Sequence, residues 1–131
     1  MVGIVLVSHS RMLAQGAAEL AEQIACGAVP VVPAGGTIDG RLGTSTELIA
    51  AAVASADQGD GIVLIPDMGS SVLSARSLLA DLDMTASGSS LVLVDAPFVE
   101  GAVAAAVTAS GGLDLASVVA AAEEARGARK L

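Results

Sequence analysis

Residues 2–7 read VGIVLV, and the polar tripeptide SHS follows at 8–10. An unbroken run of β-branched residues and leucine is typical of a strand that is buried on both faces, as in parallel sheets. The next segment has apolar residues at helical spacing, which predicts a helix that ends near Gly27. The predicted packed face of this helix consists of Leu13, Ala17, Leu20 and Ile24. The chain therefore opens as a strand and a helix, with its single histidine, His9, at the junction.

The alternation of strands and helices continues along the chain. Apolar runs at 29–35, 62–66 and 91–94 predict three further strands, and the prolines of the first favour a position near an edge of the sheet. Thr44 or Ser45 is placed to cap the helix that follows the apolar run at 29–35. Turns are predicted at GDG (59–61) and TASGSS (85–90), and two more helices after DAPFVEG (95–101) and within 111–127. The helix after the run at 29–35 has predicted packed positions at Leu48, Ile49, Ala52, Val53 and Ala56. The helix after the run at 62–66 has them at Val72, Ala75, Leu78, Leu79 and Leu82.

Strands that alternate with helices over short connections predict an α/β fold. The expected architecture is a doubly wound, mostly parallel sheet with helices on both faces, formed by residues 1–131 as a single domain. In such sheets ligands bind outside the carboxyl ends of the strands. The segments SHS, GGT, GTS, DMGSS and DAPFVEG all follow strands or begin helices, so we expect them to meet at that edge.

Composition excludes several classes of protein. Hydrophobic residues make up 53% of the chain and the mean hydropathy is +0.74. The longest apolar runs, 48–56 and 102–109, are far shorter than the roughly 20 residues of a membrane-spanning helix. No basic residue precedes the first apolar run, so it does not resemble a signal peptide, and we expect a cytoplasmic protein without a membrane partner. The net charge of −8 disfavours binding to nucleic acid.

A metal site built from histidine and cysteine is also disfavoured. The chain has one histidine and one cysteine, so neither an internal disulfide nor a His/Cys cluster is possible. Cys26, near the end of a predicted helix, is expected to be a small buried apolar residue. We expect neither a metal nor a cofactor.

His9 ends the first strand, and two readings of it are open. It could be a histidine whose ring is satisfied by the backbone, or a nucleophile at the edge of the sheet. A nucleophilic histidine needs one free ring nitrogen and an acceptor that orients the other nitrogen. Asp67, at the end of the strand at 62–66, is placed to be that acceptor, although it could equally cap the helix after DMGSS.

The residues around these two side chains predict an anion site. Glycine loops allow close backbone approach, and a helix that follows a strand presents free N–H groups and the positive end of its dipole. Neither GxxxxGK[ST] nor GxGxxG occurs, so the chain could hold a phosphoryl group without holding a nucleotide. Arg11 could contribute to this site or be a solvated helix residue. The candidate phosphate-binding and partner-binding residues are Ser8, Ser10, Arg11, Gly35, Gly36, Thr37, Gly43, Thr44, Ser45, Gly69 and Ser70.

Four motifs in this order resemble a known family. GIVLVSHS with LAQG (3–16), GGT with GRLGTS (35–45), DMGSS (67–71) and DAPFVEGA (95–102) look like the phosphotransferase subunits of bacterial dihydroxyacetone kinases. Those subunits have the mannose-type EIIA fold of the phosphoenolpyruvate:sugar phosphotransferase system. Related sugar-transporting proteins usually have glycine after the active histidine and tryptophan in the aspartate loop. Ser10 and DMGSS stand there in this chain, which favours the kinase subunit.

The resemblance implies a phosphoryl carrier. His9 would accept phosphate from phospho-HPr, a separate protein because the chain stops at Leu131, and pass it to ADP held by a kinase subunit. Family members resemble homodimers, so a homodimer is expected. One alternative is a sugar-specific EIIA protein. Another is a cobaltochelatase of the sirohydrochlorin type, to whose His-Gly-Ser motif VSHSR is similar, although such enzymes need a second metal-binding histidine. A third is a noncatalytic module of flavodoxin-like shape.

Overall fold

A computed structural model describes residues 1–81, 85 and 87–131 of the chain. Its regular elements alternate between strand and helix as far as α4, in agreement with the pattern of the sequence. Leu82, which was predicted to pack on the third helix, and Ala86 of the predicted turn at 85–90 lie outside the described residues.

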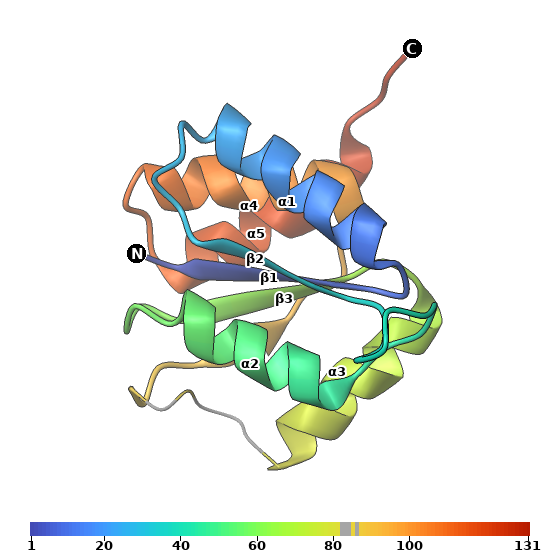
Figure 1. The fold of residues 1–131 in the computed structure, drawn as a ribbon. Helices are drawn as coiled ribbons and strands as arrows, with labels where there is room; N and C mark the ends of the chain where they lie inside the picture. Colours follow the sequence, from blue (N-terminus) through green and yellow to red (C-terminus); the bar gives the residue numbers. More distant parts are fainter. Residues whose placement is uncertain (82–84, 86) are drawn as a thin grey trace.

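The four strands of the described chain form one parallel sheet (Figure 1). They are β1 (Gly3–Ser8), β2 (Val31–Gly35), β3 (Ile62–Pro66) and β4 (Leu91–Leu93), and their order in the sheet is β2-β1-β3-β4. Every residue of β1 and β3 is buried, which confirms strands covered on both faces. The strand β2, which contains Pro33, lies at an edge, as predicted, because proline has no N–H to donate to a neighbouring strand.

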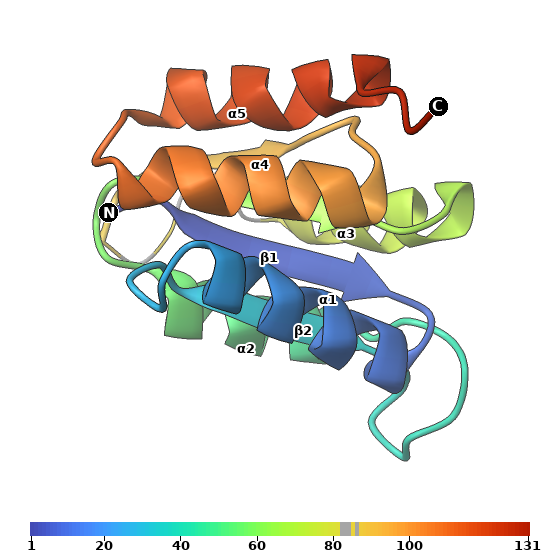
Figure 2. The same cartoon turned by 90° about the horizontal axis from the view of Figure 1, so that it is seen from above.

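The helices cover both faces of the sheet, which confirms a doubly wound fold (Figures 1 and 2). The helices α1 (Arg11–Ile24), α4 (Phe98–Ser110) and α5 (Leu115–Glu124) lie side by side on one face. The other face is covered by α2 (Thr46–Ala56) and α3 (Gly69–Asp81), and a short 3₁₀ turn, η1 (Ala125–Gly127), follows α5. No helix among the described residues is long and apolar enough to cross a membrane.

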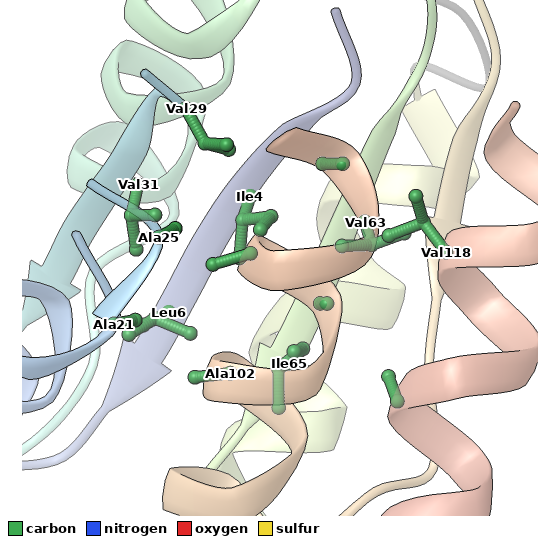
Figure 3. Close-up of a cluster of buried hydrophobic side chains, with 14 of the residues drawn as sticks. Ile4, Leu6, Ala21, Ala25, Val29, Val31, Val63, Ile65, Ala102 and Val118 are labelled. Carbon is green, nitrogen blue, oxygen red and sulfur yellow. The ribbon is translucent and has the colours of Figure 1, made fainter. Parts of the chain in front are cut away.

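Two apolar clusters fill the space between the helices and the sheet. On the side of α1, α4 and α5, Ile4, Leu6, Val63 and Ile65 of the central strands meet a layer rich in alanine (Figure 3). On the other face of the sheet, Val5, Val7, Ile62 and Leu64 belong to a cluster with residues of α2. The α2 residues Ile49, Ala52, Val53 and Ala56 are buried, as predicted.

The packed face of α1 differs from the prediction. Its buried residues are all alanines: Ala14, Ala17, Ala18 and Ala21. Leu13, Leu20 and Ile24 of the predicted face are instead 44%, 44% and 49% exposed. Small side chains let the helix axis approach the sheet closely, so the larger residues lie on the flank of the helix.

The prediction for Cys26 was also wrong, because this side chain is exposed. The helix ends at Ile24, three residues before Gly27, and Cys26 has a left-handed backbone with a φ of 60°. The amides of Cys26 and Gly27 donate to carbonyls of the last turn, those of Gln23 and Glu22. Cys26 is therefore part of the turn that terminates the helix, and its side chain points away from the core.

The register of the sheet determines where the polar segments meet. Val7 is opposite Pro66, and the Asp67 amide continues the ladder by donating to the Val7 carbonyl over 2.9 Å. On the other side, Ser8 is opposite Gly35 and accepts from the Gly36 amide. The chain order reverses between β1 and β3, so this is the switch point at which such sheets bind ligands.

Candidate active site around His9

His9 occupies the short junction between β1 and α1. Ser10 is the N-cap of α1, and its hydroxyl accepts from the Leu13 amide over 3.2 Å. The buried Ser8 hydroxyl accepts from the Ser10 amide over 3.0 Å. Both serines therefore fix the backbone on either side of His9, and this limits where the imidazole can point.

Asp67 gathers four donors around one carboxylate. Its Oδ2 accepts from the Ser8 hydroxyl at 2.9 Å and from the His9 amide at 3.0 Å. Its Oδ1 lies 3.0 Å from Nδ1 of His9 and accepts from the Met68 amide at 2.7 Å. Three of these four contacts are with Ser8 and His9, so the carboxylate faces the imidazole, and among the described residues it accepts from no amide of α3 itself.

The contacts assign the tautomer of His9. An ionised carboxylate is only an acceptor, so Nδ1 carries the hydrogen in this pair and Nε2 holds the lone pair. Burial acts to raise the pKa of Asp67, but the hydrogen bonds from the His9 amide, the Ser8 hydroxyl, the His9 ring and the Met68 amide outweigh it. The pKa of Asp67 is therefore below its usual value, and the carboxylate stays ionised at neutral pH.

In the part of the chain that the structure describes, Nε2 of His9 has one hydrogen-bond partner. The Ser70 hydroxyl lies 2.5 Å away, and because Nε2 is the acceptor, the hydroxyl donates. The side chain of His9 is 22% exposed, whereas that of Asp67 is 7% exposed. Both ring nitrogens thus contact side chains, unlike a histidine satisfied by the backbone.

The first turn of α3 faces the same space. Within the described chain, the amides of Gly69 and Ser70 donate to no protein acceptor. Free amides at a helix N-terminus attract anions, and one of them belongs to Ser70, whose hydroxyl contacts the nitrogen that holds the lone pair. The arrangement can therefore accept an electrophilic, negatively charged group at Nε2.

The loop after β2 reaches the site through its backbone. The Gly43 amide donates to the His9 carbonyl over 2.9 Å, and Gly43 needs a φ of 139° to do so. Thr37 closes the loop on itself, since its hydroxyl accepts from the Arg41 amide and its own amide donates to the Arg41 carbonyl. The Thr44 hydroxyl bonds to Ser74 on α3, so the loop is joined to both elements that carry the site.

Other predicted site residues have no hydrogen bond to the imidazole. A Cβ on Gly35 would lie 2.4 Å from the Ser10 carbonyl oxygen, so this glycine lets β2 pass under the start of α1. Gly36 donates to the Ser8 carbonyl, and Ser45 is the N-cap of α2. Arg11 is exposed at the first position of α1. These residues position the site, and their contact with phosphate or partners stays a prediction.

Sequence analysis missed two contributors. Ser74 was not singled out, although it follows Ser70 by one helical turn and could have been found by that spacing. The Met68 amide was missed because a backbone donor leaves no trace in the residue type. Within the described ranges, no three histidine, cysteine, aspartate or glutamate side chains are grouped as metal ligands.

Comparison with known proteins gives consistent matches. The family model EIIA-man, described as "PTS system fructose IIA component", matches residues 3–119. A phosphoryl donor subunit DhaM of PEP-dependent dihydroxyacetone kinase 2 from Listeria innocua is 41% identical, over 82% of this chain and 85% of that protein. The DhaM subunit of Providencia stuartii is 33% identical, over 99% of this chain but only 28% of its own length.

A solved structure supports the same fold. The crystal structure of EF1359, a protein of unknown function, superposes with a TM-score of 0.81 at 37% identity. The match covers 94% of this chain and 93% of that one.

Proposed function

The chain belongs to the EIIA-man family, and we propose that it is the phosphoryl donor subunit of a PEP-dependent dihydroxyacetone kinase, a phosphotransferase component that carries phosphate on His9. The observation that carries this proposal is the 3.0 Å contact between Asp67 Oδ1 and His9 Nδ1. It leaves Nε2 as a nucleophile at the carboxyl edge of the sheet. The names of the relatives favour this role over that of a sugar-specific EIIA protein.

The first transfer needs no proton to be added or removed. The Nε2 lone pair attacks the phosphorus of a phosphohistidine on the donor protein HPr, a new P–N bond forms, and the donor's P–N bond breaks. The electron pair of the broken bond stays on the donor imidazole. The ring of His9 keeps its hydrogen on Nδ1 and gains positive charge, which the Asp67 carboxylate stabilises across the 3.0 Å contact.

The second transfer reverses these steps toward a different acceptor. A terminal phosphate oxygen of ADP, held by the kinase subunit, attacks the phosphorus, and the P–N electron pair returns to Nε2. The His9 ring is a good leaving group in this step, because it departs from phosphorus as a neutral imidazole. Asp67 thus stabilises the phosphorylated ring, and the phosphoryl group can still be transferred to ADP.

Ser70 and the start of α3 receive the phosphoryl group in this mechanism. The Ser70 hydroxyl donates to Nε2 before the reaction, and it must turn away as the phosphorus approaches. It is then placed to donate to a phosphoryl oxygen, together with the free amides of Gly69 and Ser70. Ser8, Ser10, Gly43 and Thr44 act by holding the backbone that surrounds the ring.

The proposal includes a homodimer of this domain. The flank of α1 supports it, because Leu13, Leu20 and Ile24 remain nearly half exposed and form an apolar stripe at helical spacing. The helix α1 that carries this stripe lies beside α4 on one face of the sheet (Figure 2), whereas His9 follows the carboxyl end of β1.

The test is phosphoryl acceptance by variants of His9. Purified protein is incubated with labelled phosphoenolpyruvate, enzyme I and HPr, and the label on each variant is counted. His9→Ala and His9→Gln should accept no label and keep the circular dichroism spectrum of the wild type, because Asp67 retains three of its four donors. A His9→Ala variant that is still labelled by phospho-HPr would show that the nucleophile lies elsewhere.

A further inference from the structure

Three side chains of the site form a series of hydrogen bonds that ends on a hydroxyl. Asp67 Oδ1 lies 3.0 Å from His9 Nδ1, and His9 Nε2 lies 2.5 Å from the Ser70 hydroxyl. In the tautomer that Asp67 imposes, Nε2 holds the lone pair and the hydroxyl donates to it. A serine bound to an imidazole that a carboxylate orients has the geometry of a Ser-His-Asp triad, which is recognised by roles and not by sequence position.

Phosphoryl transfer leaves the contact between Ser70 and Nε2 unused. A histidine that attacks phosphorus needs no hydroxyl on its nucleophilic nitrogen, and this hydroxyl must turn away before the P–N bond forms. In the unphosphorylated protein the same contact holds a base against a hydroxyl. An adjacent base is what turns a serine hydroxyl into a nucleophile.

The backbone around Ser70 supplies donors for attack on a carbonyl group. Ser70 is the second residue of α3, and its side chain is exposed, so small reagents reach the hydroxyl. Within the described chain, the amides of Gly69 and of Ser70 itself donate to no protein acceptor. Two free amides beside a nucleophile stabilise the oxyanion of a tetrahedral intermediate.

A hollow of about 410 Å³ adjoins the turn that carries Ser70. It lies between the ends of β3 and β4 and the start of α3, and Met68 and Gly69 form part of its wall. Pro66, Val72 and Leu93 give it an apolar side. The hollow is large enough to receive the acyl part of a small ester.

We propose that Ser70 is an acyl-accepting nucleophile, with His9 as its general base and Asp67 as the residue that positions the ring, so that the unphosphorylated protein hydrolyses small activated esters. This activity goes beyond the proposed phosphoryl transfer. It uses the imidazole of His9 as a base, whereas phosphoryl transfer uses it as a nucleophile.

The acylation step balances on these side chains. The Ser70 oxygen attacks the carbonyl carbon of the ester while its proton passes to Nε2, and an electron pair of the carbonyl bond moves onto the oxyanion. The intermediate then collapses, because the ester C–O bond breaks and the proton on Nε2 passes to the leaving oxygen. The products are an acyl-serine and an alcohol.

Water then releases the acyl group by the same route. Nε2 takes a proton from a water molecule, whose oxygen attacks the carbonyl carbon of the acyl-serine. The bond between Ser70 and the acyl group breaks, and the proton on Nε2 returns to the serine oxygen. The acid leaves, and Ser70 and His9 are restored to their initial state.

The two activities exclude each other at one atom. A phosphoryl group on His9 occupies the lone pair of Nε2, so the phosphorylated protein has no base for Ser70. The activation of Ser70 is therefore confined to the unphosphorylated state.

The experiment treats the unphosphorylated protein with two reagents. A fluorophosphonate bonds to an activated serine hydroxyl and releases fluoride, and p-nitrophenyl acetate reports acyl transfer by the release of p-nitrophenolate. Peptide mass spectrometry should place the phosphonyl group on Ser70. Ser70→Ala and His9→Ala should each lower the rate of both reactions at least about 100-fold, the lower end of what a positioned base contributes.

Ser77→Ala is the matched control, because Ser77 is exposed on the same helix about two turns beyond Ser70. It should react at the wild-type rate. The competing route is attack on the ester by Nε2 itself, which makes an acylimidazole on His9 and leaves Ser70 unmodified. An unchanged release of p-nitrophenolate by Ser70→Ala, or a phosphonyl group on another residue in place of Ser70, would overturn the proposal.

Phosphorylation of His9 provides a second test. Protein that has been phosphorylated with phospho-HPr should no longer react with the fluorophosphonate at Ser70, and reaction at the unphosphorylated rate would overturn the role of Nε2 as the base. Failure of phospho-HPr to label the protein would overturn the proposed function. The reactions of the unphosphorylated protein need no HPr, so they decide the proposal for Ser70 in either case.

Discussion

At the scale of single residues, the imidazole of His9 is held at both nitrogens by side chains with different properties. Asp67 is almost buried and bound by four donors, so it is a fixed partner for Nδ1. Ser70 is at the surface and has a hydroxyl that rotates, so it is a replaceable partner for Nε2. One nitrogen is oriented while the other is available, as nucleophilic catalysis requires.

Replacement of Asp67 should slow the chemistry without removing the nucleophile. Asp67→Ala is expected to reduce the rate of phosphoryl transfer by roughly 10–100-fold, the usual effect of losing an orienting partner. The reduction should be seen with both phospho-HPr and the small donor phosphoramidate, because Asp67 acts on the imidazole of His9 and not on the donor. Nitrogen-15 NMR of the imidazole should show a mixture of tautomers in place of the Nδ1–H form. A variant with wild-type rates and a single tautomer would limit Asp67 to a structural role.

The sequence predicted the residues of this site better than their contacts. His9 and Asp67 could be paired because each comes within two residues of the end of a buried apolar run, and parallel strands end at the same edge. The direct bond from Ser70 to Nε2 could not be deduced, because it depends on how the 67–70 turn folds back toward His9. Gly35 and Ser45 were predicted as candidate phosphate-binding residues. In the structure Gly35 allows β2 to approach the backbone of Ser10 closely, and Ser45 caps α2.

At the scale of elements, the fold depends on helices that approach the sheet closely through alanine. The buried residues of α4 are Gly101, Ala102, Ala105, Ala106 and Ala109, and those of α1 are also alanines. Apolar periodicity identified the α1 helix but misassigned its face, since larger residues are the usual indicator of a core. The strand order could not be predicted from local patterns either, because it depends on contacts between segments that are distant in the sequence.

The approach of α1 to β2 can be tested with two glycines. In Gly35→Ala the new Cβ meets the Ser10 carbonyl oxygen at 2.4 Å, and that backbone cannot move without disturbing α1. We expect a loss of about 1–3 kcal/mol in the free energy of unfolding, measured by urea denaturation.

Gly16→Ala is the matched control for this effect. Gly16 is within α1 and has no atom within 4 Å of an added Cβ, so alanine should stabilise the protein by about 0.5–1 kcal/mol. Equal effects of the two substitutions would refute the packing role of Gly35.

The connection between α2 and β3 contains a carboxylate, Asp57, that responds to acid. A hydrogen bond from the Gly59 amide is the main cause that lowers the pKa of Asp57 from 3.8 to about 2. Hydrogen bonds from Thr85 and Ser87 lower this pKa further, and desolvation opposes them. Unfolding raises this pKa, so the stabilisation is complete above 3.8 and is lost as the pH falls toward 2. Asp57→Asn should therefore reduce the acid dependence of stability between about pH 5 and pH 2. Urea denaturation at several pH values measures this, and identical pH profiles for variant and wild type would disprove it.

At the scale of the whole molecule, the few basic residues are unevenly distributed. The net charge is −8, yet Arg11, Arg41 and Arg76 follow β1, β2 and β3 at the carboxyl ends of the strands. Arg126 and Lys130 reach the same end, where they contact Asp95 and Glu100. These cations offset carboxylates such as Asp39, Asp95 and Glu100 at this edge, so the excess negative charge lies on the remainder of the surface.

The central claim is that the phosphoryl group is carried on nitrogen of His9 and not on oxygen of Ser8, Ser10 or Ser70 beside it. The most direct measurement is the stability of the label after transfer from phospho-HPr, with one half of the sample held in acid and the other in alkali. Protonation makes imidazole a good leaving group, so phosphohistidine should lose its label in acid and keep it in alkali. Phosphoserine would survive acid and eliminate in alkali, so a label that persists in acid and is lost in alkali would contradict the claim.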